Sequence, residues 1–249
     1  MIASIKAEFL KLFTIRSTYI ILSLAFLLEI LFAFYASGWR AQPADLANSG
    51  YVSSQVVSAL VPLTLLAAIA AILLITHEYR YNIIMHTLTA NKSRTTVFIS
   101  KLFAISVFAI VFALFFGFLS PVLGALGVKL HSHVLAHQYI PVWSLFWRTV
   151  FYGWGFAMLA SIIAFIIRIQ VGAIVAVFLI PSTIENILGL ILKQNQVYLP
   201  FSSLSVLIGE RSNDIAAHLT FVQAASVTAL YIVVGWLVAW YLFIKRDAN

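Results

Sequence analysis

Six apolar blocks, each long enough to cross a lipid bilayer, constrain the fold of this chain more than any other feature. The hydrocarbon core of a bilayer is about 30 Å thick, and a helix of about 20 apolar residues crosses it. The expected spans cover about residues 18–37, 56–75, 97–120, 145–167, 171–192 and 221–244. The sequence therefore predicts an all-α integral membrane protein with six transmembrane helices.

The composition excludes a water-soluble globular domain. Of the 249 residues, 63% are apolar and 9% are charged, and the mean hydropathy is +1.03. A soluble domain has about 25% charged residues. Six spans leave too few residues for a nucleotide-binding domain, so we expect a single transmembrane domain over residues 1–249. Any ATP-driven chemistry must then come from a partner. The absence of cysteine excludes disulfides, thiolate metal sites and cysteine nucleophiles.

The N-terminal residues predict an amphipathic helix that lies on the membrane surface. Ile5, Phe9 and Leu12 recur at helical spacing within residues 2–13, so they share one face. The apolar block that follows could also be a secretory signal peptide. Against that alternative, the block is too long, contains Glu29 and ends without a cleavage site. We therefore interpret it as the first span.

The lysine and arginine residues are distributed unevenly between the two sides of the expected bundle. With the N-terminus in the cytoplasm, ten of the 15 lie on the cytoplasmic side and five lie outside. Cytoplasmic loops of membrane proteins carry an excess of these residues. We therefore expect both termini to be cytoplasmic, and the net charge of +7 reflects membrane topology rather than nucleic-acid binding.

The cytoplasmic segment between the second and third spans combines charged and apolar residues. A purely solvated loop has no need of Ile83, Ile84, Met85 and Leu88, which follow Arg80. Such a composition indicates a short amphipathic helix that docks into the cleft of a partner. The alternative is a helix that lies on the bilayer and inserts the same apolar groups into lipid.

The same segment carries a spaced set of residues: Glu78-Tyr79-Arg80, Thr87-Leu88, Ser93-Arg94 and Lys101. With these residues it resembles the first cytoplasmic loop of ABC-2 type permeases, the membrane subunits of ATP-binding-cassette exporters. Two asparagines depart from the pattern, because Asn82 stands where glycine is common and Asn91 where proline is common. Asparagine tolerates the left-handed conformation that glycine would supply. The N-terminal residues 7–11 resemble the interfacial helix of these permeases, and the order of spans agrees over essentially all 249 residues.

The resemblance implies an exporter permease in a bacterial cytoplasmic membrane, working as a homodimer or with a related permease. Two separate cytosolic ATPase subunits would bind ATP and Mg and grip the loop as a coupling helix. The chain itself is then no enzyme and binds no cofactor. By the same resemblance, the residues expected to couple the permease to the ATPase are Glu78, Tyr79, Arg80, Met85, Leu88, Arg94 and Lys101.

Two carboxylates lie at membrane depth, Glu29 in the first span and Glu185 in the fifth. Burying an ionised carboxyl group without a partner is costly, so we expect at least one of them to be functional or paired. The resemblance places spans one, two and five at the central dimer interface. Glu29, Glu185 and Asn186 are therefore candidates for the translocation pathway of a cationic or hydrogen-bonding substrate. The alternative is that both carboxylates are packing groups between helices.

Two outer segments carry weaker signals. His131, His133 and His137 match no zinc-site spacing and have no carboxylate nearby, so we expect solvated loop histidines and no metal. Residues 199–214 mix apolar and polar side chains. We expect this segment to re-enter the outer leaflet as short helices, with a surface loop as the alternative.

Two other function classes remain open from the sequence. The first is an ion- or proton-coupled secondary transporter with Glu29 or Glu185 as its proton site, although the chain shows no internal repeat of the kind common in such transporters. The second is a stand-alone membrane-embedded enzyme, although no Gly-x-Ser-x-Gly motif is present. The transported substrate is not encoded in the apolar pattern.

Overall fold

The computed structural model describes residues 2–46, 48, 50–90, 93–131, 142–208 and 219–246. Within these residues every regular element is a helix, and six helices are long and apolar enough to cross a membrane, as the sequence predicts. The spans are formed by α2 (Arg16–Glu29) with η1 (Ile30–Trp39), α4 (Tyr51–Arg80), α6 (Arg94–Leu130), α7 (Val142–Ile167), the broken fifth span described below, and α11 (Phe221–Lys245). Shorter helices are α1 (Ile2–Thr14), α3 (Pro43–Leu46), α5 (Ile84–Ala90) and α10 (Pro200–Ile208).

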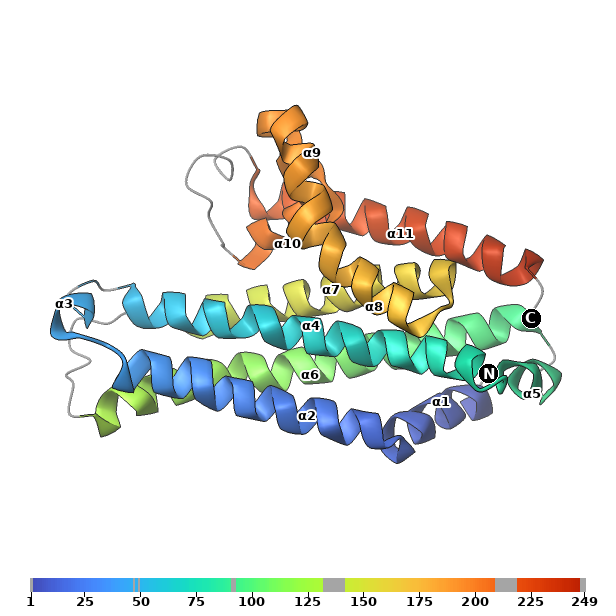
Figure 1. The fold of residues 1–249 in the computed structure, drawn as a ribbon, viewed down its shortest axis with the longest axis horizontal. Helices are drawn as coiled ribbons and strands as arrows, with labels where there is room; N and C mark the ends of the chain where they lie inside the picture. The colour runs from blue at the N-terminus through green and yellow to red at the C-terminus, as the bar shows by residue number, and fades with distance from the viewer. Residues whose placement is uncertain are drawn as a thin grey trace.

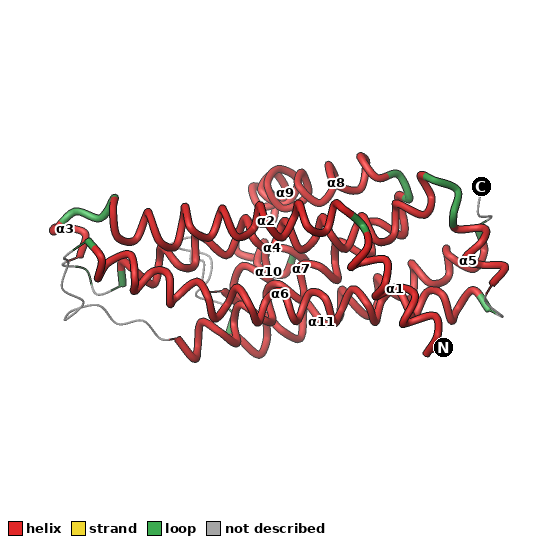
Figure 2. Tube along the Cα trace, turned by 90° about the horizontal axis from the view of Figure 1, so that it is seen from below, coloured by secondary structure: helices red, strands yellow, loops and turns green. Residues whose placement is uncertain are grey.

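The spans form an elongated bundle with α4 and α7 at its centre. These two helices pack against each other and against α6, and together they contribute half of the buried residues of the apolar core. The first, fifth and sixth spans lie outside them and expose long apolar faces, as helices surrounded by lipid do. Both termini and α5 lie at one end of the bundle, and α3 lies at the other (Figure 1). The view from below shows the same arrangement (Figure 2).

The N-terminal helix α1 joins the first span at a sharp elbow. It extends over Ile2–Thr14, one residue longer than the expected 2–13. Ile15 is extended, with φ −78° and ψ 123°, and α2 begins at the next residue. Glu8 and Leu12 are buried on the inner face of α1, so the helix is amphipathic in the predicted sense but also buries a charge.

The first span changes from α-helix to π-helix immediately after Glu29. Ala33 follows the buried Glu29 by four residues, and the buried pair Ser37 and Gly38 follows Ala33 by four and five, which matches the wider turn of a π-helix. A Cβ atom on Gly38 would lie 2.1 Å from the carbonyl oxygen of Gly127 in α6. Only glycine permits this backbone contact, which holds η1 against α6. Nothing in the apolar run on either side of Glu29 predicts this change of helix type.

The third span is one continuous helix that passes through Pro121 and ends ten residues beyond the expected end at 120. Its 37 residues correspond to about 55 Å at about 1.5 Å per residue. This is longer than the roughly 30 Å bilayer core. Because the helix is longer than the bilayer core is thick, its far end lies outside the hydrocarbon region. At the near end, the Ser93 hydroxyl accepts a hydrogen bond from the Thr96 backbone N–H at 3.2 Å and begins the helix.

The fifth span is broken into four pieces. A π-helical turn η3 (Ile180–Ile184) contains Pro181 and separates α8 (Gln170–Leu179) from α9 (Glu185–Leu192), and a 3₁₀ helix η4 (Lys193–Tyr198) follows. Proline lacks a backbone N–H and interrupts the regular helix, which accounts for the break. The orange helix α9 stands away from the bundle, and α10 returns the chain towards it (Figure 1). The first described piece of the 199–214 segment is therefore a short helix, as expected, while residues 209–214 lie outside the described chain.

Candidate functional site

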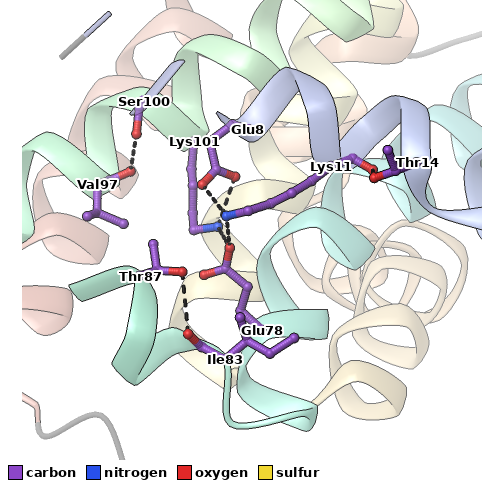
Figure 3. A network of polar contacts seen from close by, with 9 residues as sticks. All are labelled: Glu8, Lys11, Thr14, Glu78, Ile83, Thr87, Val97, Ser100 and Lys101. Carbon is purple, nitrogen blue, oxygen red and sulfur yellow. Dashed lines mark hydrogen bonds and ion pairs between the residues drawn. The ribbon is translucent and has the colours of Figure 1, made fainter. Parts of the chain in front are cut away.

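Four charged side chains from three helices meet near the end of the bundle that carries both termini. We call Glu8, Lys11, Glu78 and Lys101 the ion cluster (Figure 3). Lys101 Nζ lies 3.0 Å from Glu8 Oε2 and 2.7 Å from Glu78 Oε1. Lys11 Nζ lies 2.7 Å from Glu8 Oε1 and also pairs with Glu78. The cluster thus joins α1, α4 and α6 with two positive and two negative charges.

Burial makes the balance of charge in the ion cluster important. Lys101 is 0% exposed, Glu8 2% and Glu78 4%. Burial lowers the pKa of Lys11, but the carboxylates of Glu8 and Glu78 raise it by more, so this pKa lies above its ordinary value. Removing one partner of a buried ion pair typically costs about 3–5 kcal/mol, because a charge is left uncompensated. The cluster therefore fixes α1 firmly to α4 and α6.

The turn between α4 and α5 has the geometry expected from Asn82. This residue is in the left-handed conformation with φ 55°, which confirms that asparagine supplies what glycine would here. The Ile83 N–H donates to the Glu78 carbonyl oxygen at 2.9 Å, and the Asn82 N–H to that of Tyr79 at 3.3 Å. These two bonds are those of a Schellman motif, which ends a helix sharply. The turn thus joins α5 to the end of α4, which contributes Glu78 to the ion cluster.

The helix α5 presents apolar side chains outward at the end of the bundle. Met85 is 48% exposed and Ile83 43%. Ile84 is buried, and Leu88 is half-buried against the core. The outward apolar surface of this segment therefore comes from Ile83 and Met85, while Leu88 mainly holds the helix in place.

The remaining predicted coupling residues bind neighbouring helix ends. Arg80 donates to the Gln170 side-chain oxygen at 3.1 Å. Arg94 donates to the carbonyl oxygens of Ile244 and Arg246 at the end of α11, at 2.9 and 3.1 Å. Tyr79 lies under the guanidinium group of Arg168, 5.2 Å from it. These contacts tie α4 and α6 to the fifth and sixth spans.

The structure therefore places the seven predicted coupling residues in three environments. Glu78 and Lys101 lie inside the ion cluster, Met85 faces outward, and the other four contact neighbouring helices. The sequence reasoning did not identify Glu8 and Lys11 as their partners. A signal was present, because Glu8 lies between Ile5 and Leu12 on the inner face of α1, where an unpaired charge would be costly.

A cavity of about 440 Å³ lies between the broken fifth span and the centre of the bundle. We call it the membrane pocket. Its polar lining includes Glu185, Asn186, Gln196, Ser202 and Ser205, and its apolar lining comes largely from α4, α7 and α10. The structure thus brings the adjacent residues Glu185 and Asn186 to one pocket.

The carboxylate of Glu185 caps the N-terminus of α10. Its Oε1 accepts the Phe201 backbone N–H at 2.8 Å, and its Oε2 accepts the Ser202 N–H and hydroxyl, each at 2.6 Å. A carboxylate at a helix N-terminus is stabilised by the unpaired N–H groups and by the helix dipole. Asn186 instead donates to the Ser182 carbonyl oxygen at 2.7 Å and is exposed. Glu185 therefore holds the pocket wall together.

Glu29 lies elsewhere and has a different environment. It is 0% exposed, does not line the membrane pocket, and neither carboxyl oxygen has a hydrogen-bond partner among the described residues. The Ser120 hydroxyl of α6 lies beside it without hydrogen-bond geometry. The structure thus does not bring together the two carboxylates that the sequence grouped.

The described part of the chain contains no cluster of three or more His, Asp or Glu side chains able to hold a metal ion. His131 ends α6 and its ring lies 4.7 Å from that of Trp39. His133 and His137 lie outside the described residues.

The sequence of this chain matches the model of a known protein family. A family model described as "ABC-2 family transporter protein" matches residues 4–184, which is more than half of the chain. The matched region contains the ion cluster, α5 and Glu29, and it ends one residue before Glu185. The comparison with curated proteins found no match.

Proposed function

Because the chain belongs to the ABC-2 transporter family, whose members are membrane transport subunits, we propose that it is the permease of an ATP-driven exporter. It pairs with a second permease in the membrane and takes its energy from separate cytosolic ATPase subunits. The end of the bundle that carries both termini and α5 faces the cytoplasm. The chain itself catalyses no reaction, and ATP and Mg are bound by the ATPase.

The observation that carries this proposal is the ion cluster beside α5. A partner that changes shape with ATP can shift the permease only if it binds two permease conformations with different affinity. Such coupling needs a stiff connection between the docking surface and the spans. A tight turn joins α5 to α4, and α4 enters the ion cluster with α1 and α6. Movement of α5 is therefore transmitted to the second and third spans and to α1 as one unit.

In this proposal the predicted coupling residues have two different roles. Met85, together with Ile83, fills a groove of the ATPase, as the exposed apolar side of a docking helix does. Glu78 and Lys101 do not touch the partner, because they are buried. They are positioning residues that keep the end of α4 rigid. Arg80 and Arg94 hold the adjoining helix ends in register.

The membrane pocket is the best candidate for part of the translocation pathway. It combines amide and hydroxyl groups with aromatic walls, and the break at Pro181 leaves backbone groups near its lining. Such a lining suits an amphipathic substrate with hydrogen-bonding groups. Glu185 fixes the wall, and Asn186, Gln196 and Ser205 offer the polar contacts.

The test is copurification of the ATPase with the permease from native membranes in mild detergent. The wild-type complex should contain a nucleotide-binding protein, and Met85→Asp should lose it while remaining inserted in the membrane. Met85→Leu is the matched control, because it keeps an apolar side chain at the same position and should retain the ATPase. If no nucleotide-binding protein accompanies the wild-type chain, the exporter proposal fails. If Met85→Asp retains the ATPase and transports normally, docking through α5 is wrong.

A further inference from the structure

A second, larger cavity opens between α1, α2 and α6, on a part of the molecule that the proposed function does not use. Its volume is about 670 Å³, within the usual range for ligand pockets. We call it the elbow groove, because it lies inside the bend between α1 and α2. Of the described residues that line it, Ser23 is the one with a polar side chain. The lining is otherwise aliphatic or aromatic, and includes Phe13, Phe26, Phe108, Phe112 and Phe116.

The floor of the elbow groove is a row of aromatic rings along α6. The ring centroids of Phe108 and Phe112 are 5.9 Å apart, and those of Phe112 and Phe116 are 4.6 Å apart. The lining residues of α6 extend from Val107 to Phe116, a distance of about 13.5 Å at about 1.5 Å per residue. The groove is therefore elongated along a spanning helix, and its floor is apolar throughout.

Two positively charged side chains lie on the helix faces that line the elbow groove, each beyond the lining residues. Lys6 precedes the lining residue Phe13 by seven residues on α1, and Arg16 precedes Ser23 by seven on α2. Seven residues are close to two helical turns, so each cation shares a face with a lining residue. Both side chains are exposed, and neither forms an ion pair with any described residue. The elbow groove thus combines an apolar interior, which we call the slot, with two positive charges that form no ion pair with a described residue.

We propose that the elbow groove binds one anionic phospholipid, with an acyl chain in the slot and the phosphate between Lys6 and Arg16. A membrane phospholipid combines both chemistries, since its chain is apolar and its headgroup is negative. Basic side chains at the surface of a bilayer attract anionic lipids. The site is concave and is formed by three helices of one chain, which suits a lipid chain better than the flat face of a second copy.

The test uses the purified full chain in mild detergent with phosphatidylglycerol or with phosphatidylcholine of the same acyl chains. Native mass spectrometry counts the lipids that remain bound. We expect one phosphatidylglycerol per chain and weaker retention of phosphatidylcholine. Lys6→Gln with Arg16→Gln should weaken phosphatidylglycerol binding on the order of 30-fold, from the usual contribution of two basic residues near an anionic surface. Arg40→Gln, at the other end of the same span and exposed, is the matched control and should change nothing.

A second variant tests the slot itself. Ser23→Phe places a ring in the groove and should abolish retention of both lipids, whereas Ser226→Phe, at an exposed position on α11, should not. Equal retention of the two lipids by the wild-type chain overturns the headgroup assignment. Unchanged retention in Ser23→Phe overturns the slot assignment. If Ser23→Phe alters the oligomeric state and leaves lipid bound, a second copy occupies the groove instead. Should Ser23→Phe fail to fold, the charge variants still decide the proposal, because both positions are on the surface.

Discussion

Glu185→Gln keeps the size of the side chain but removes one of the two acceptor oxygens that cap α10. The carboxylate now accepts three hydrogen bonds from Phe201 and Ser202. Glutamine has one acceptor oxygen and one NH₂ group, which can only donate. Whichever way the amide is turned, a backbone N–H of Phe201 or Ser202 then faces another donor.

The size of the expected loss of stability follows from these contacts. A buried donor left without an acceptor costs about 1–3 kcal/mol, and changing the remaining bonds from charged to neutral costs about 1 kcal/mol more. The expected loss is about 2–4 kcal/mol of local stability. Removing the charge also relieves the cost of burying it, which by itself would leave stability unchanged or raise it. The unpaired N–H and the weakened bonds in the variant oppose that gain, and we expect the loss to be the larger of the two.

Hydrogen exchange measures this loss directly. Amides of α10 should exchange about 30- to 1,000-fold faster in Glu185→Gln, as expected for a loss of about 2–4 kcal/mol in the opening free energy. Amides of α7 serve as the internal reference and should be unaffected in the centre of the bundle. Unchanged protection of α10 in the variant would refute the capping role. Because the variant alters the pocket wall, loss of transport in it does not by itself assign Glu185 to the pathway.

Glu29→Gln should leave thermal stability in detergent unchanged or raise it, because Glu29 accepts no hydrogen bond from any described residue that the amide would lose; a clear fall in Tm would contradict this. Lys101→Met should lower the free energy of unfolding by about 3–5 kcal/mol. Adding Glu78→Gln should recover part of this loss, because it restores the charge balance of the ion cluster. If the two effects on the free energy of unfolding are simply additive, Lys101 and Glu78 do not interact as the ion cluster requires. In this cysteine-free chain, Gln42→Cys should react with an impermeant thiol reagent in intact cells and Thr89→Cys should not, and the opposite labelling would reverse the orientation.

The sequence by itself determined the number of spans, the helix before the first span and the short helix between the second and third. These features depend on local properties: the length of an apolar run against the thickness of a bilayer, and the period of apolar residues along a helix. The left-handed turn at Asn82 was predictable for the same reason, since it depends on the side chain of a single residue. The break near Pro181 also has a local cause.

Only the tertiary structure decided what the charged residues do. Lys11 and Glu78 are 67 residues apart in the sequence, and Glu8 and Lys101 are 93 apart, so no local pattern pairs them. The packing of α1 against α4 and α6 brings them together. In the same way, the position of α10 makes Glu185 a cap, while the contact of η1 with α6 leaves Glu29 buried without a hydrogen-bond partner among the described residues. A charge in a membrane protein is accommodated by whichever group lies next to it, and helix packing decides which group that is.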